Sequence, residues 1–192
     1  MYVIGITGGV GSGKSLVANK LKELYNAELL IADELGHIVT MPGDLGYQKI
    51  KERFGEDIID KEGFIDRKKL ADIIFNDDNA RKDINAIVHP EVMSYIEKYI
   101  SERKDKKGYI ILETAIMYET GCDKFCDEVW YVYVPADIRI ARLKENRGYS
   151  YDKSCAIIKK QKSDNYFIER ADFVIDNSGS IEELEQKLIV NT

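Results

Sequence analysis

The 192-residue sequence lacks a long apolar run, an excess of positive charge and an even number of cysteines. No stretch reaches the roughly 18 consecutive apolar residues of a membrane span, and no basic leader precedes the first apolar residues. Cys122, Cys126 and Cys155 have no zinc-type spacing, so we expect free, buried thiols in a reducing compartment. We therefore expect a cytoplasmic protein without a membrane anchor.

Positive charge is scarce as well. The 28 Lys and Arg are outnumbered by 34 Asp and Glu, which gives a net charge of −6. A dedicated nucleic-acid binder normally has a basic excess or a basic face, so no nucleic-acid partner is expected. The lysine-rich segment 101–107 is interrupted by acids and is typical of a solvated helix end. An anionic ligand must be held by a few local cations, and we expect a monomer or a weak homo-oligomer.

The arrangement of apolar residues predicts an α/β protein. Short apolar runs, typical of buried parallel strands, alternate with longer helical patterns. This alternation predicts a five-stranded parallel sheet flanked by helices on both faces. The expected strands are 2–7, 27–33, 109–113, 128–134 and 172–176, and the expected helices outside the insertion are 15–24, 135–148, 150–168 and 180–189.

The segment 34–106 is too long for a simple crossover between strands. Its pattern is mainly helical, with turn-forming clusters at 41–44 and 60–66. We expect a single domain in which this segment is a helical, substrate-binding insertion. The rest of this domain is expected to consist of a core and a lid. The core comprises residues 1–33, 107–141 and 170–192, and the lid comprises residues 142–169.

A glycine-rich motif, GITGGVGSGKS at 5–15, carries the strongest functional signal. Gly8, Gly13, Lys14 and Ser15 fill the pattern G-x-x-x-x-G-K-[ST] between a predicted strand and a predicted helix. Glycines let successive backbone N–H groups point at phosphate oxygens, and the helix N-terminus adds its positive dipole end. The motif predicts a P-loop NTPase fold, with nucleotide contacts from Gly9, Val10, Gly11, Ser12, Gly13, Lys14, Ser15 and Leu16.

The rest of the sequence favours a kinase over a GTPase switch. A guanine-reading N-K-x-D motif is absent. The D-x-x-G match at 33–36 follows the glycine-rich motif too closely to leave space for a switch segment. We therefore expect ATP as phosphate donor and Mg²⁺ as its partner, with Ser15 helping to hold the metal and Lys14 reaching the β- and γ-phosphates. A nucleotide-binding protein without transferase activity remains a further interpretation.

Two acidic residues end predicted strands, at the edge where ligands gather in open α/β sheets. Asp33 is a candidate base for the proton of an acceptor hydroxyl. Its alternative role is to cap the next helix. Glu113 is a candidate water-mediated Mg²⁺ ligand, or else a capping or ion-pairing residue.

Three arginines, Arg139, Arg142 and Arg147, follow the fourth predicted strand. Arg139 and Arg142 are three residues apart and share a helix face. Arg147 precedes Gly148, which suits a hinge. Arginines that cover a transferring phosphoryl group must move aside while substrate enters, so the segment resembles a mobile lid. Solvated surface arginines are the alternative interpretation.

Together, these residues resemble the dephospho-CoA kinase family over almost the full length. The resemblance is carried by GITGGVGSGKS, by Ala32-Asp33 followed by Pro42-Gly43, and by three longer stretches. These are FGEDIIDKEGFIDRKKLADIIF (54–75), INAIVHPEV (84–92) and RADFVIDNSG (170–179). The resemblance implies that ATP phosphorylates the ribose 3′-hydroxyl of dephospho-CoA, the last step of coenzyme A synthesis.

The resemblance also implies roles for individual residues. It makes Asp33 the base, places Arg142 first among the lid arginines, and puts Asn177 in the loop that lines the adenine. His89 lies on the acceptor side, although a packed helix histidine is the alternative. With these roles, the expected catalytic residues are Lys14, Asp33, Arg142 and Arg147. The expected substrate-binding residues are Thr7, Asp33, His37, His89 and Glu113.

The sequence departs from the family pattern at five positions: Ile31, His37, Ala115, Asn146 and Phe167. Ile31 replaces the first carboxylate of a D-A-D element, and Asn146 stands at the second lid arginine, next to Arg147. Most departures lie in acceptor-side or lid segments. The resemblance therefore constrains ATP use more strongly than acceptor identity, and a related kinase acting on a nucleoside monophosphate is the alternative.

Overall fold

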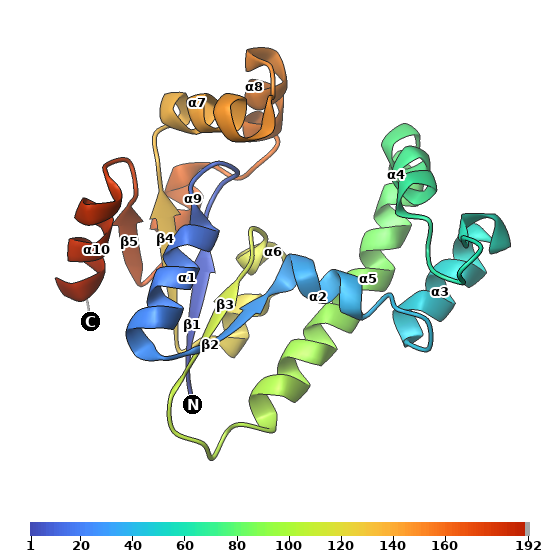
Figure 1. Ribbon diagram of the computed structural model, residues 1–192, viewed down its shortest axis with the longest axis horizontal. Helices are drawn as coiled ribbons and strands as arrows, with labels where there is room; N and C mark the ends of the chain where they lie inside the picture. The colour runs from blue at the N-terminus through green and yellow to red at the C-terminus, as the bar shows by residue number, and fades with distance from the viewer. Residues whose placement is uncertain (191–192) are drawn as a thin grey trace. The chain divides into compact units, whose positions relative to one another are not determined.

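The structure, a computed structural model, describes residues 1–190 and divides into two compact units (Figure 1). One unit combines Met1–Leu30 with the chain from Asp105 onward, and we call it the sheet unit. The other spans Ile31–Lys104, and we call it the helical unit. The sequence placed the bounds of the insertion at 34 and 106, close to these positions.

A five-stranded parallel sheet in the order β2-β3-β1-β4-β5 confirms the expected fold class. Strands β1 and β3 are paired so that Ile6 lies beside Glu113, and β1 and β4 so that Ile6 lies beside Trp130. The expected bounds of the first and third strands were correct. The strands are β1 (Tyr2–Thr7), β2 (Glu28–Ile31), β3 (Tyr109–Glu113), β4 (Glu128–Tyr133) and β5 (Phe173–Asp176).

Strand β2 is shorter than the sequence predicted. It ends at Ile31, and Ala32 and Asp33 already belong to helix α2 (Ala32–Ile38). The apolar pattern of 27–33 did not mark this change, because Ala and Asp are compatible with the first turn of a helix and an acid there interacts favourably with the helix dipole.

The sheet is covered on both faces. Side chains of Ile4 and Ile6 pack in one core cluster with Leu21 of α1 (Lys14–Tyr25) and Leu188 of α10 (Ile181–Val190). On the opposite face, a Cβ at Gly5 would lie 2.7 Å from Met117 Cε and from Cys126 Sγ. Glycine at this position therefore lets the segment after β3 approach the central strand closely. That segment contains α6 (Met117–Thr120) and η2 (Cys122–Phe125).

The remaining helices of the sheet unit follow β4. Helix α7 (Ala136–Arg147) begins after Pro135 and ends at Gly148, whose φ of 63° suits a glycine stop. The expected helix 150–168 is in fact two helices, α8 (Tyr151–Lys159) and α9 (Asp164–Ile168). The break occurs because the Ser163 hydroxyl accepts a hydrogen bond from the backbone of Tyr166 and so starts a new helix.

The helical unit has its own small core of Ile50, Ile58 and Ile84. The turn clusters predicted at 41–44 and 60–66 do separate helices. Asp66, at the end of the second cluster, caps α4 by accepting hydrogen bonds from the backbone of Lys68 and Lys69. The elements after α2 are α3 (Leu45–Phe54), η1 (Glu56–Ile58), α4 (Arg67–Asn76) and α5 (Asp78–Ser101).

The expectations about the cysteines and about a membrane-spanning segment can be compared with the structure. None of the three cysteines is in a disulfide, and only Cys122 is fully buried, while Cys126 and Cys155 are half-buried. Within residues 1–190, none of the helices combines the length and apolarity that crossing a membrane would require.

Candidate active site

The glycine-rich motif forms a loop between β1 and α1. Gly11 and Gly13 adopt φ values of 79° and 84°, a left-handed conformation that residues with a Cβ rarely adopt. Gly13 is also the N-cap of α1, whose first residue is Lys14, so the loop leads directly into a helix N-terminus. Lys14 Nζ donates to the carbonyl of Gly9 across the loop, at 3.3 Å. The loop thus combines backbone N–H groups, a helix dipole and one ammonium group, which together suit a polyphosphate.

Ser15 and Glu113 meet beside this loop. The strand register places Glu113 next to Ile6, one residue before the end of β1, and the Ser15 hydroxyl donates to Glu113 Oε1 at 2.9 Å. Glu113 is only 6% exposed. The described residues contain no cluster of three His, Cys, Asp or Glu side chains that could hold a metal ion. A hard cation at Ser15 and Glu113 would therefore need further oxygen ligands, such as phosphate and water.

Asn177 binds the other side of the loop. Its side-chain amide donates to the carbonyl of Ser12 at 2.8 Å, and its own carbonyl accepts from Arg142 at 2.9 Å. A Cβ at Gly13 would lie 2.5 Å from Asn177 Nδ2, so glycine permits this close approach. Asn177, expected from the resemblance to line the adenine, is buried and directly supports the loop, and Arg142 lies next to it.

The three arginines after β4 have different environments. Arg139 is 5% exposed, so it is not the solvated residue that the alternative interpretation described. Arg142 is half-buried and hydrogen bonded to Asn177. Arg147, the last residue of α7, is exposed. Arg147 is therefore the most solvent-accessible of the three arginines.

Most of the residues expected to contact the acceptor lie in the helical unit. Asp33 is exposed in the first turn of α2, and its side chain makes no capping hydrogen bond there, so the capping alternative does not apply. His37 is exposed in the same helix. His89 lies within α5, where burial lowers the pKa of its imidazole below the usual value. Thr7, at the end of β1, is fully buried.

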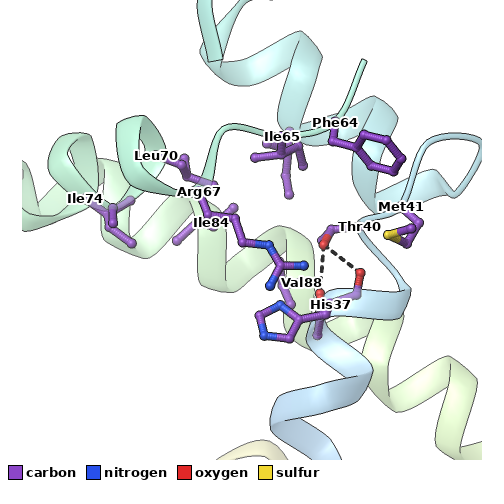
Figure 2. Close-up of a pocket in the computed structure, with 13 residues that line it drawn as sticks. His37, Thr40, Met41, Phe64, Ile65, Arg67, Leu70, Ile74, Ile84 and Val88 are labelled. Carbon is purple, nitrogen blue, oxygen red and sulfur yellow. Dashed lines mark hydrogen bonds between the residues drawn. The ribbon is translucent and has the colours of Figure 1, made fainter. Parts of the chain in front are cut away.

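A cavity of about 250 Å³ lies within the helical unit (Figure 2). Apolar side chains from α3, α4, α5 and the segments that precede α3 and α4 form most of its wall. His37 and Thr40 lie on its α2 side, where the Thr40 hydroxyl donates to the carbonyls of Gly36 and His37. Figure 2 shows Arg67 extending from the start of α4 toward His37. No carboxylate of the described residues pairs with Arg67, so its charge is available to an anion.

Sequence reasoning did not assign Arg67 to the site. Arg67 closes the G-x-[LI]-[DN]-R turn of the stretch 54–75, so the signal was present but carried no chemical role. Gln161 was missed too. Its amide oxygen contacts the backbone of Val10 in the glycine-rich loop at 3.0 Å, across 151 residues of sequence. No local pattern marks a lone glutamine after a helix, and only the tertiary fold places it there.

Comparison with known proteins agrees with the family resemblance of the sequence. A family model described as dephospho-CoA kinase matches residues 2–183. A dephospho-CoA kinase from Carboxydothermus hydrogenoformans is 38% identical over 188 residues, which cover 97% of this chain and 91% of the relative.

Two solved structures extend this comparison. The protein TT1252 from Thermus thermophilus has 29% identity and a TM-score of 0.80, with 99% of this chain and 95% of that chain covered. The dephospho-CoA kinase from Campylobacter jejuni has 24% identity and a TM-score of 0.73, with 98% and 94% covered, and supports the fold.

Replacement of Lys14 tests the phosphate-binding loop. We expect Lys14→Ala to lower kcat by about 10²- to 10³-fold, the usual loss when one oriented donor to a transition state is removed. The thermal unfolding temperature should change little. Lys22→Ala, an exposed lysine of the same helix α1, is the matched control and should keep full activity. Near-normal activity of Lys14→Ala would contradict the assignment.

Proposed function

This chain belongs to the dephospho-CoA kinase family, and we propose that it transfers the γ-phosphate of ATP to the ribose 3′-hydroxyl of dephospho-CoA. The observation that carries the proposal is the match to dephospho-CoA kinases over nearly the whole chain. In this reaction the acceptor oxygen attacks the γ-phosphorus, the bond to the β–γ bridging oxygen breaks, and ADP leaves.

The glycine-rich loop would bind the phosphates of ATP. Its N–H groups and Lys14 offset the negative charge of the β- and γ-phosphates, and the charge that moves onto the leaving oxygen in the transition state. The hydroxyl of Ser15 and the carboxylate of Glu113, 2.9 Å apart, are the hard oxygen donors that Mg²⁺ prefers. When bound, Mg²⁺ would supply additional positive charge at the phosphate oxygens.

Asp33 would accept the proton of the attacking 3′-hydroxyl. Its carboxylate is exposed and makes no capping hydrogen bond, so it is available to a ligand. A carboxylate in this role orients the acceptor hydroxyl and removes the proton as the new bond forms.

The lid arginines would have separate roles. Arg142, fixed by its hydrogen bond to the carbonyl of Asn177, would contact the nucleotide that the loop holds. The exposed Arg147 would supply the mobile positive charge over the phosphoryl group. Gly148, with a φ of 63°, would allow the chain after Arg147 to change direction.

The cavity of the helical unit would receive the part of dephospho-CoA that does not react. Its volume of about 250 Å³ is below the roughly 300–1,000 Å³ of sites that enclose a whole ligand, so it suits one part of a long molecule. The apolar wall suits the pantetheine arm. Arg67, which has no ion partner in residues 1–190, suits the diphosphate that joins this arm to the adenosine.

A panel of acceptors tests the proposed reaction. We expect ADP release with ATP and dephospho-CoA to exceed that with CMP, dTMP or AMP by orders of magnitude, because only dephospho-CoA carries the diphosphate and arm that the helical unit would bind. Turnover with a nucleoside monophosphate alone would instead identify a related P-loop kinase. ATP binding without turnover on any acceptor would indicate a nucleotide-binding protein.

Replacement of Asp33 tests the base. We expect Asp33→Asn to lower kcat by about 10²- to 10⁴-fold, because the amide cannot take the proton, while ATP affinity stays unchanged. Glu34→Gln is the matched control, since Glu34 is an exposed acid in the same helical turn. A parallel loss of ATP affinity in Asp33→Asn would point to a metal-binding or structural role.

Replacement of Arg67 tests the cavity. We expect Arg67→Ala to raise KM for dephospho-CoA about tenfold, the size expected when a charge-assisted hydrogen bond to an exposed diphosphate is lost. The KM for ATP should not change. Lys68→Ala removes the same charge from the next residue of α4, which is also exposed, and should leave both KM values unchanged. Equal effects of the two substitutions would indicate only a general loss of positive charge.

A further inference from the structure

Val10, in the middle of the glycine-rich loop, is bound on both of its backbone polar groups. Its N–H donates to Gln161 Oε1 at 3.0 Å, and its carbonyl accepts from Arg139 Nε at 2.8 Å. Arg139 Nη2 also donates to the same Gln161 oxygen, at 2.6 Å. Because both neighbours of this oxygen are donors, only the carbonyl end of the Gln161 amide can occupy the position.

The two side chains come from different parts of the sheet unit. Arg139 is the fourth residue of α7, at the end of the expected core segment 107–141, and Gln161 lies in the expected lid segment, in the short link between α8 and α9. Asp164, the first residue of α9, is 3.8 Å from Arg139 and accepts a hydrogen bond from the hydroxyl of Tyr131 on β4. Through Asp164, the contact between Arg139 and Gln161 is therefore connected to strand β4 of the central sheet.

Burial of the charged Arg139 side chain costs folding free energy. Its side chain is 6% exposed, and its nearest carboxylate, that of Asp164, is 39% exposed, so the charge is only partly compensated. Its donors, however, are used on Val10 and Gln161 rather than on a solvent-facing acid. An arginine held in this way has its geometry fixed by the loop that it contacts.

The glycines of the loop fit against Arg139. A Cβ at Gly9 would overlap with the Arg139 guanidinium group. A Cβ at Gly11 would lie 3.0 Å from the Arg139 carbonyl oxygen. Gly9 and Gly11 flank Val10, so the first half of the loop lies directly on this arginine, while Asn177 supports the second half at Ser12.

We propose that Gln161 and Arg139 are positioning residues that hold Val10, and with it the first half of the glycine-rich loop, in the shape that receives the phosphates of ATP. Neither residue needs to touch the nucleotide. A loop with several glycines would otherwise lose backbone freedom on binding, and ordering a single residue costs roughly a factor of ten in affinity. The proposal rests on ATP as the ligand of the loop but not on the identity of the acceptor.

Direct measurement of ATP binding to the full chain, without acceptor, tests the proposal. Gln161→Met keeps the length of the side chain and removes the shared acceptor oxygen. We expect it to weaken ATP affinity about tenfold and to raise KM for ATP to a similar extent, with the KM for dephospho-CoA unchanged. Lys160→Met, an exposed neighbour in the same link, is the matched control and should bind ATP normally.

A double-mutant cycle adds a test that a general structural role would not pass. If Gln161 and Arg139 act as one unit, Gln161→Met combined with Arg139→Met should weaken ATP binding no more than the stronger single variant does. Multiplicative losses would overturn the proposal. Should Arg139→Met fail to fold, Gln161→Met alone decides.

Three other results would also overturn it. These are unchanged ATP affinity in Gln161→Met, an equal loss in Lys160→Met, and a parallel change in the KM for both substrates with a lowered unfolding temperature. Failure of the proposed reaction gives a different pattern, because a chain that does not phosphorylate dephospho-CoA can still show the expected changes in ATP affinity.

Discussion

The left-handed turns at Gly11 and Gly13 are the constraint on which the rest of the site depends. A polyphosphate is held by main-chain N–H groups only if the backbone curls around it, and this curl requires residues without a Cβ. A loop of this kind is intrinsically flexible, so other parts of the fold must hold it. The structure supplies Asn177 at Ser12 and Arg139 with Gln161 at Val10, from three different segments.

These supports explain how an acidic protein can bind a highly charged anion. With a net charge of −6, the chain as a whole repels a polyphosphate. Attraction must come from oriented N–H groups and a few cations at short range, where the low local dielectric makes each more effective. The hydrogen bonds of Asn177 and Gln161 add no net charge and instead keep the loop dipoles in place. Oriented N–H groups and nearby cations thus compensate for the repulsion between the negatively charged protein and the polyphosphate.

Much of the fold could be predicted from the sequence, because its strongest signals are local. The apolar runs 2–7 and 109–113 gave correct strand bounds, and Pro135 and Gly148 marked the ends of α7. The errors occurred where two structures share the same residues. Ala32 and Asp33 are compatible with a strand end or with a helix start, and the break before α9 depends on the Ser163 cap within an otherwise helical pattern.

The site was predictable only where chemistry is concentrated in a short motif. The loop with its Lys14 and Ser15 is marked by a motif in the sequence, whereas Gln161 is not, since its partner is 151 residues away. Phe167 illustrates the same limit. At this departure from the family pattern, its ring is buried and stacks on Tyr131 at 4.9 Å, and the Tyr131 hydroxyl binds the Asp164 carboxylate beside Arg139. A substitution that looks isolated in the sequence therefore packs against Tyr131, whose hydroxyl binds the acid beside the arginine that supports the loop.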